Sequence, residues 1–461
     1  NDGRKALSKV ENGQQLVTGE KRKYSKEDYI LLLVCVAFYL FFCICYGVEI
    51  CADSAGYMEM ISAREPVYPL FLSAFRWLFG VHYYLNMVIL FQNLLMAYAV
   101  WKISLWFRYK FMLPLWLTSV VVVTHFAVVL LCQYAAARAS VYTNSILTEG
   151  IALSLWLLFM YFLLEALFEY NLKYVLYALL LAAVMFDTRK QMAVAYIVLF
   201  GTLFLGWLGK KGYLKKILIT LAMIIGSLFL ALLGTRIYNY ALRGEFAQNT
   251  RDMNLVLTTT LYVADKEDVR LIPEESVRQL YTEVMDVLYK NGSNIDFAGA
   301  GWKNLESHYS EHFDKITIDT TAPMFLEYAI AHGFSEGIEA EQEADRACKV
   351  IVKALFWDNI GKYAKVYGAS MANGFINTIA KRNAVLDYCA VAAYAGYLFL
   401  MTANLLSKER RCYGLAGMTV LIAVAVNVMV AAALIFCQTR YMIYNMALFY
   451  SAFIVMLYPY M

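Results

Sequence analysis

The sequence predicts an all-α, polytopic membrane protein with about ten transmembrane helices. Hydrophobic residues make up 61% of its 461 residues and charged residues only 16%, whereas about 25% of residues are charged in soluble domains. Apolar runs of roughly 18 residues or more recur along most of the chain. As helices, these runs are long enough to cross a hydrocarbon core about 30 Å thick.

The apolar runs are the candidate spans. The first, 29–50, is too long for the core of a signal peptide and no small-residue cleavage site follows it, so we expect a retained anchor. The run 172–187 is short, so its helix must stand nearly upright or be partly buried. The candidate spans are 29–50, 83–106, 112–133, 145–167, 172–187, 190–208, 214–235, 384–405, 413–437 and 440–460.

Basic residues set the orientation of the spans, because short cytoplasmic connections carry an excess of Lys and Arg. Clusters of them occupy alternate connections, which predicts that both termini are cytoplasmic. The outer face then holds residues 51–82, the connection 134–144, the turn Asp187–Lys190 and the long segment 236–383. The basic clusters are Lys21, Arg22, Lys23 and Lys26; Arg108 and Lys110; Lys210, Lys211, Lys215 and Lys216; and Lys408, Arg410 and Arg411.

This topology divides the chain into four parts. The long outer segment is polar, but apolar residues recur in it at helical spacing, so we expect a mainly helical insertion. Its predicted helical stretches are 276–289, 296–313 and 336–362. The four parts are a basic tail (1–28), the first spans with their outer loop 51–82 (29–235), the outer-face insertion (236–383) and the last three spans (384–461).

The first outer loop predicts two helices that lie on the membrane surface. Residues 54–64 form the first, and Pro66 and Pro69 should end it, because proline lacks the backbone donor and clashes with the preceding turn. Residues 70–80 are apolar but too short to cross the bilayer, so they form the second.

Asp53 stands at the start of this loop. A carboxylate at a bilayer surface is costly unless it is hydrated or partnered, so it indicates a functional site. Glu49 would share its helix face if the first helix continues. The alternative is that Asp53 only caps the helix 54–64. The residues leave both interpretations open.

Further charged residues stand at the outer ends of predicted spans. Each basic one alone is typical of an interfacial anchor, because long basic side chains extend to the headgroups. As a set of cations beside one carboxylate, they fit recognition of a phosphate that links lipid and sugar, and they would stabilise it as a leaving group. These residues are Arg138, Glu149, Arg189, Lys190 and Arg440.

Other motifs point to no chemistry. His308-Tyr-Ser-Glu-His312 matches a zinc-peptidase pattern, but short patterns arise by chance and we expect a solvated helix face. The nine cysteines form no C-x-x-C pair, which argues against a disulfide framework or zinc site. The absence of a glycine-rich phosphate loop argues against chemistry driven by a cytosolic nucleotide, and we expect no nucleic-acid partner.

The arrangement resembles the GT-C superfamily of membrane glycosyltransferases, best over residues 29 to 235. The matching residues are Asp53, Gly56-Tyr57, Arg64-Glu65-Pro-Val-Tyr-Pro-Leu-Phe-Leu, Ser145-Ile-Leu-Thr-Glu149-Gly and Arg440-Tyr441. The insertion before the last three spans departs from the family, in which a soluble domain usually follows the last span.

The resemblance implies an inverting glycosyltransferase of a bacterial cell membrane. A sugar would pass from a polyprenyl-phosphate donor to a glycan, lipid or protein acceptor on the outer face, within the catalytic module 29–235. Asp53 would be the general base. No cofactor need is expected, although a divalent metal stays open because 134–144 holds no second acidic residue. The substrate-binding set would be Arg64, Arg138, Glu149, Arg189, Lys190, Arg440, Tyr57 and Glu65.

Three other functions remain as alternatives. A lipid-linked polysaccharide polymerase or ligase also uses outer arginines, but it needs no base at Asp53. A lipid-linked-sugar transporter predicts polar residues at mid-bilayer depth and related halves. His125 and Asn427 are the main polar residues at depth, and both are typical of helix packing. A non-enzymatic scaffold of an envelope complex would need only the insertion.

Overall fold

The computed structural model describes residues 24–135, 139–250, 252–380 and 383–461. Within these ranges the regular secondary structure is helical, apart from one isolated bridge between Glu49 and Ser145. Eight of the described helices are long and apolar enough to cross a membrane, and two shorter apolar helices accompany them. The predicted all-α, polytopic membrane fold is therefore confirmed.

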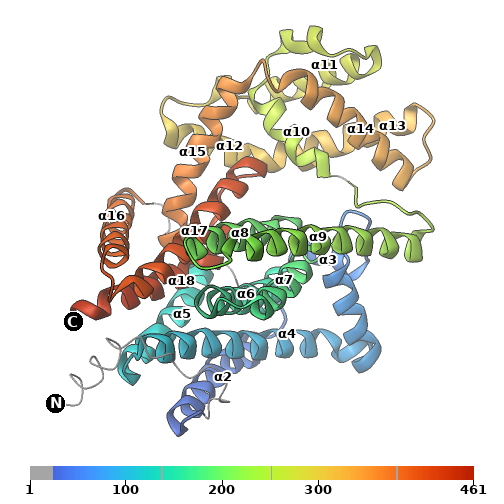
Figure 1. The fold of residues 1–461 in the computed structure, drawn as a ribbon. Coiled ribbons are helices and arrows are strands. Elements are labelled where there is room, and N and C mark those ends of the chain that lie inside the picture. Colours follow the sequence, from blue (N-terminus) through green and yellow to red (C-terminus); the bar gives the residue numbers. More distant parts are fainter. Residues whose placement is uncertain (1–23, 136–138, 251, 381–382) are drawn as a thin grey trace, which may run out of the picture.

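The membrane-length helices pack in one bundle, in which some run side by side and others cross them at an angle (Figure 1). The long ones are α2 (Lys26–Tyr46), α4 (Val67–Phe111), α6 (Glu149–Glu169), α8 (Val194–Trp207) with the short helix Lys190–Ala193 before it, α9 (Tyr213–Arg243), α16 (Ala384–Leu406), α17 (Arg411–Leu434) and α18 (Thr439–Leu457). The two shorter ones are α5 (Leu115–Ala135) and α7 (Leu172–Phe186).

The first loop differs from its prediction. Its first helix, α3 (Ser54–Met58), is short, and Met60 after it has a left-handed backbone with φ 55°. The prolines begin a helix rather than end one: Pro66 is the N-cap of α4, and Pro69 lies in the first turn. Proline is tolerated there because the first backbone N–H groups of a helix have no partner within it.

Helix α4 has two arms. Gly80 interrupts it with φ 72° and ψ 170°, a conformation that glycine adopts without a Cβ penalty. Residues 67–79 therefore form a separate arm that corresponds to the second predicted surface helix, and only the part after Gly80 belongs to the bundle. Trp77, 83% exposed, and the exposed Leu78 and Phe79 cover the outside of this arm.

The chain between α9 and α16 forms a group of helices that rises from the bundle (Figure 1). The first predicted stretch, 276–289, matches its helix, but Gly301 (φ 90°) delays the second, and a turn at 356–359 divides the third. The helices are α10 (Asp252–Val263), α11 (Glu275–Lys290), α12 (Trp302–Asp314), a π-helical segment Lys315–Thr321, α13 (Ala322–Ala331), α14 (Ile338–Leu355) and α15 (Ile360–Ile379).

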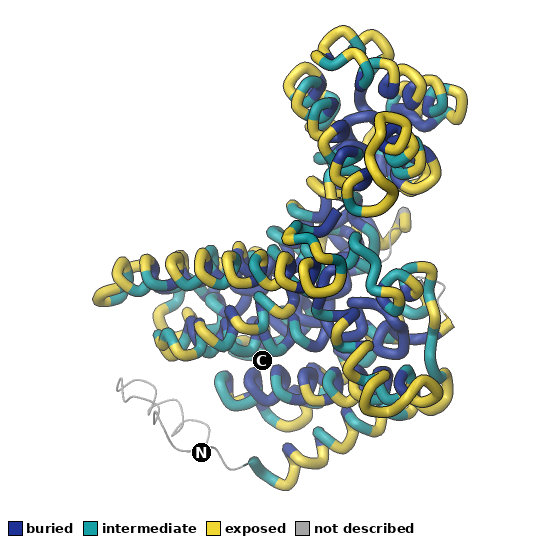
Figure 2. Tube along the Cα trace, turned by 90° about the vertical axis from the view of Figure 1, so that its right-hand side faces the viewer, coloured by how far each residue is buried: buried dark blue, intermediate teal, exposed yellow. Residues whose placement is uncertain are grey.

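Buried apolar residues fill the bundle and the insertion separately. In the bundle, Trp156 and Trp207 are among the largest fully buried side chains. The membrane-length helices expose residues on the outside of the bundle (Figure 2), and many of these exposed residues are apolar. A second core in the insertion includes Tyr281 and Phe313. Helix α15 packs on α17 and α18 and so joins the insertion to the bundle.

Several basic connections gather at one end of the bundle, opposite the start of α6. At one end Lys110 pairs with Glu169, the last residue of α6, at 3.0 Å. Burial and the nearby charges of Lys216, Lys110 and Arg411 lower the pKa of Lys210 there, so basic connections predicted to share a side lie together. Glu149 begins α6 and therefore lies about 30 Å away at 1.5 Å per residue, at the opposite end.

Candidate functional site

Two loops lie against each other at the end of the bundle where α6 begins. Helix α2 ends at Tyr46, and Gly47 turns the chain with φ 63°. The backbone N–H of Glu49 donates to Asn144 O at 3.0 Å, and that of Ile146 donates to Glu49 O at 3.0 Å. Glu49 is thus in a loop, not on a helix face shared with Asp53, which corrects that prediction.

A buried polar network on α4 fixes these loops. Gln92 donates to Thr143 O at 2.9 Å and accepts from the Tyr68 hydroxyl at 3.0 Å. Asn93 donates to the Asn144 side chain at 2.7 Å. Buried polar groups need such partners, so the loop conformation depends on α4. The sequence reasoning missed this network, although adjacent amides in an apolar run were a visible signal.

Asp53 is the N-cap residue of α3, but its side chain makes no capping hydrogen bond. Its carboxylate instead pairs with Arg64 at 2.8 Å and with Arg440 at 3.3 Å. The interpretation of Asp53 as only a helix cap is therefore wrong. Burial raises the pKa of Asp53, but the charges of Arg64 and Arg440 outweigh burial and hold that pKa below its usual range.

Glu149 is fully buried and holds two arginines. One of its oxygens accepts hydrogen bonds from both Arg189 and the Nε of Arg440, and the other is 3.3 Å from Arg440. Arg440, at the start of α18, therefore bridges Glu149 and Asp53. We call Asp53, Arg64, Glu149, Arg189 and Arg440 the arginine–carboxylate cluster.

Tyrosine rings support two of these arginines. The guanidinium of Arg64 lies 4.6 Å from the centre of the Tyr57 ring, and that of Arg189 lies 4.7 Å from the centre of the Tyr441 ring. The aromatic face attracts a cation and leaves the guanidinium edges free for oxygen partners. Three cations and two carboxylates then leave the cluster with an excess positive charge when all are ionised, which suits an anionic ligand.

Glu65 and Lys190 belong to a second group next to the first. Lys190 pairs with Glu65 at 3.4 Å and with Asp252, the first residue of α10. Asp187 ends α7, and its backbone carbonyl accepts from Val67 N at 3.0 Å. We call Glu65, Asp187, Lys190 and Asp252 the acidic cluster.

The acidic cluster holds carboxylates that resist ionisation. Burial raises the pKa of Glu65 to about 7; Lys190 opposes this rise and Asp252 adds to it. Burial, together with the negative charge of Glu65, raises the pKa of Asp187 to about 7. The insertion also comes close to the first cluster, since burial and the charge of Asp53 raise the pKa of Asp314 at the end of α12.

The structure brings most of the predicted site residues together, with two exceptions. Arg138 lies outside the described residues. Glu65 and Lys190 pair with one another rather than with the arginines. No group of three or more His, Cys, Asp or Glu side chains within the described ranges is arranged to hold a metal ion. His308 uses both ring nitrogens in hydrogen bonds, to the Tyr262 hydroxyl at 2.9 Å and Gly292 O at 3.1 Å.

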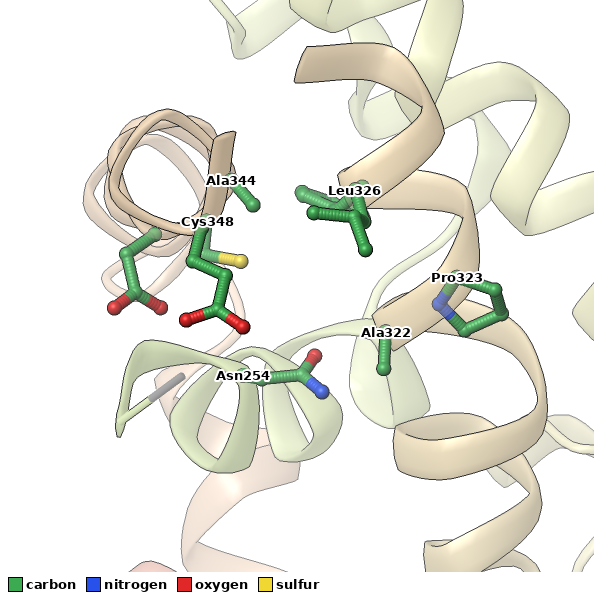
Figure 3. A pocket seen from close by; sticks show the side chains of 9 residues that line it. Asn254, Ala322, Pro323, Leu326, Ala344 and Cys348 are labelled. Carbon is green, nitrogen blue, oxygen red and sulfur yellow. The ribbon is translucent and has the colours of Figure 1, made fainter. Parts of the chain in front are cut away.

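A cavity of about 220 Å³ lies inside the insertion rather than at either cluster. Figure 3 shows Asn254, Ala322 and Leu326 around it, with Ala344 and Cys348 of α14 opposite. Its lining is mainly apolar. It touches the site region through Glu341, which lines it and accepts a hydrogen bond from Ser62 at 2.7 Å.

Comparison of the chain with protein-family models, curated proteins and solved structures finds no match. Its function is therefore inferred from the chemistry of the two clusters. The arginine–carboxylate cluster can bind an anion at the end of a lipid-facing bundle, and it places one carboxylate, Asp53, within reach of that anion.

Proposed function

We propose that the chain is an inverting membrane glycosyltransferase that uses a polyprenyl-phosphate-linked sugar donor. The observation that carries the proposal is the position of Arg440, which contacts buried Glu149 and half-exposed Asp53 at once. One arginine thereby links a fixed structural anion with a carboxylate that a ligand can reach.

The donor phosphate would take the place of the Asp53 carboxylate as the partner of Arg64 and Arg440. Glu149 is fully buried, so it keeps Arg189 and Arg440 in place whether or not ligand is bound. Asp53 is 36% exposed at its side chain and can give up its two ion pairs. A phosphodiester presents oxygens that suit the forked guanidinium group better than a point charge would.

Binding of the phosphate would also prepare the base. At rest, Arg64 and Arg440 lower the pKa of Asp53 and weaken it as a proton acceptor. When phosphate oxygens take over those arginines, the pKa of Asp53 rises, and the carboxylate can accept the proton of an acceptor hydroxyl. That oxygen bonds to the anomeric carbon while the bond from this carbon to the phosphate oxygen breaks. The leaving polyprenyl phosphate stays paired with the arginines.

The proposal is tested with Asp53→Asn. Mass spectrometry of lipids that co-purify with the wild-type protein identifies the donor, and transfer is then measured with purified protein in vesicles. We expect transfer to fall by about 10²–10⁴-fold, the usual contribution of a positioned base, with donor affinity retained. The matched control is Glu169→Gln, which removes an ion-paired carboxylate at the far end of α6 and should leave transfer unchanged.

Two results would count against the proposal. Wild-type transfer by Asp53→Asn would refute the base assignment and favour a lipid-linked polysaccharide polymerase or ligase, which needs the cations but no base here. Unchanged donor affinity in both Arg440→Ala and Arg64→Ala would refute the phosphate site.

A further inference from the structure

We infer that the acidic cluster is the subsite for the donor's sugar, in which Glu65 and Asp187 accept hydrogen bonds from its hydroxyl groups. This inference rests on the proposed function. It assigns Glu65 to the sugar rather than to the phosphate, and it adds Asp187, which the sequence analysis did not single out as a ligand.

The first support is the placement of the two clusters. Neighbouring residues in the chain belong to different clusters. Arg64 binds Asp53 and Arg189 binds Glu149 in the arginine–carboxylate cluster. The residues that follow these arginines, Glu65 and Lys190, pair with each other at 3.4 Å in the acidic cluster. Consecutive Cα atoms are about 3.8 Å apart. A sugar linked to a phosphate on the arginines is therefore adjacent to the acidic cluster.

The second support is a pair of buried oxygens without partners. Glu65 is 9% exposed, and its Oε2 has no hydrogen-bond partner within the described part of the chain. The same holds for Oδ1 of Asp187, although Asn249 and Thr235 lie within interaction distance of the Glu65 and Asp187 carboxyls, respectively. Buried polar atoms are almost always paired, so each orphan needs an explanation. Hydroxyl groups of a ligand supply it, since they can donate to an oxygen of either the ionised or the protonated carboxyl.

One side of the cluster reaches the surface of the protein. The side chains of Lys190 and Asp252 are 30% and 50% exposed. On the α9 side, Gly234 faces Asp187, and a Cβ there would lie 3.8 Å from its Oδ2. Gly234 itself therefore adds no side-chain atom next to Asp187.

The charges define which sugars fit. Glu65 and Asp252 pair with Lys190, and Asp187 lies close enough to Glu65 to feel its charge, so carboxyl groups outnumber the one cation and the subsite favours neutral hydroxyl groups over a second anion. We therefore expect an uncharged hexose rather than a sugar that carries a carboxylate or sulfate. The adjacent arginines take the one negative charge, on the phosphate.

The experiment compares two soluble probes, citronellyl phosphate and citronellyl phosphate linked to mannose, glucose or galactose, by calorimetry with the detergent-purified full chain. The wild-type protein should bind at least one linked sugar more tightly than the bare phosphate. Glu65→Gln and Asp187→Asn should each reduce this preference by about tenfold, as expected for a lost hydrogen bond to a charged group. Both should bind bare citronellyl phosphate within about twofold of wild type.

The matched control is Glu59→Gln, which replaces an exposed carboxylate of the first loop outside both clusters and should retain the preference. The inference would be overturned if Glu65→Gln and Asp187→Asn still preferred the linked sugar over the bare phosphate. It would also be overturned if both variants were folded but no longer bound the bare phosphate. If the wild-type protein binds the phosphate but prefers no sugar, the subsite fails while the proposed function stands. If it binds neither probe, the proposed function fails and this subsite with it.

Discussion

Replacing Glu65 with glutamine should stabilise the protein by an amount that grows as pH rises above 4.5 and is complete above about pH 7. The carboxyl has a pKa of 4.5 in an unfolded chain, and burial raises it to about 7 in the folded protein, with Lys190 opposing and Asp252 adding to the rise. Below pH 4.5 both states hold the proton. Between pH 4.5 and about 7 the folded state alone holds it, so the free energy of unfolding falls as pH rises through this window.

The size of the effect follows from that interval. Each pKa unit corresponds to about 1.4 kcal/mol, so a rise from 4.5 to about 7 costs ~3 kcal/mol once Glu65 is ionised. Glutamine keeps the shape without the charge and avoids this cost. For cooperative unfolding of a chain of this length, ~3 kcal/mol corresponds to about 3 °C in the midpoint.

The assay is thermal unfolding of the purified protein in a nonionic detergent, followed by tryptophan fluorescence at about pH 5, 7 and 8.5. The variant should gain most at the highest pH and little at the lowest. Glu59→Gln is the matched control, because Glu59 lies in the same loop with an exposed side chain, and it should show no pH-dependent gain. Equal midpoints for Glu65→Gln and wild type at pH 8.5, or a larger gain at pH 5, would refute the reasoning.

Two further predictions concern the helix that begins at the site. Glu149→Gln should destabilise the protein by about 3–5 kcal/mol, because it leaves two largely buried arginines short of their anion; a midpoint unchanged from wild type would contradict this. Gly150→Ala would place a Cβ 2.5 Å from the Gln92 side chain and should cost about 1–3 kcal/mol through the loop network. The control is Gly226→Ala in α9, where a Cβ meets nothing within 4 Å and should cause no such loss. A Gly150→Ala protein with the same unfolding midpoint as wild type would refute the predicted clash.

Hydropathy predicts the bundle well because bilayer thickness sets the length of every span. Local chemistry is harder to foresee. Sequence reasoning treated Pro66 and Pro69 as helix breakers, although proline suits the first turn of a helix equally well. It also began the fourth span at 145 rather than at Glu149, because the contacts of Ser145 and Asn144 with the first loop join residues far apart in the chain.

The sequence predicts which residues gather at the candidate site, but it does not predict which of their side chains form ion pairs. The positive-inside rule sorts charges by side of the membrane, so it grouped Asp53, Glu149 and Arg440. It carries no information on which side chains touch. The bond from Arg440 to both carboxylates, and the separation of Glu65 and Lys190 from the arginines, depend on how α6, α8 and α18 pack.

The glycine kink in α4 affects how the protein would meet its ligand. The arm before Gly80 carries exposed Trp77 and Phe79, side chains suited to the headgroup layer. The arm begins next to Glu65, and its Val67 is tied to Asp187 at 3.0 Å. We expect the arm to lie in the headgroup layer and to keep both clusters at the depth of the lipid phosphates. A lipid-borne donor would then arrive by lateral diffusion in two dimensions, without leaving its leaflet.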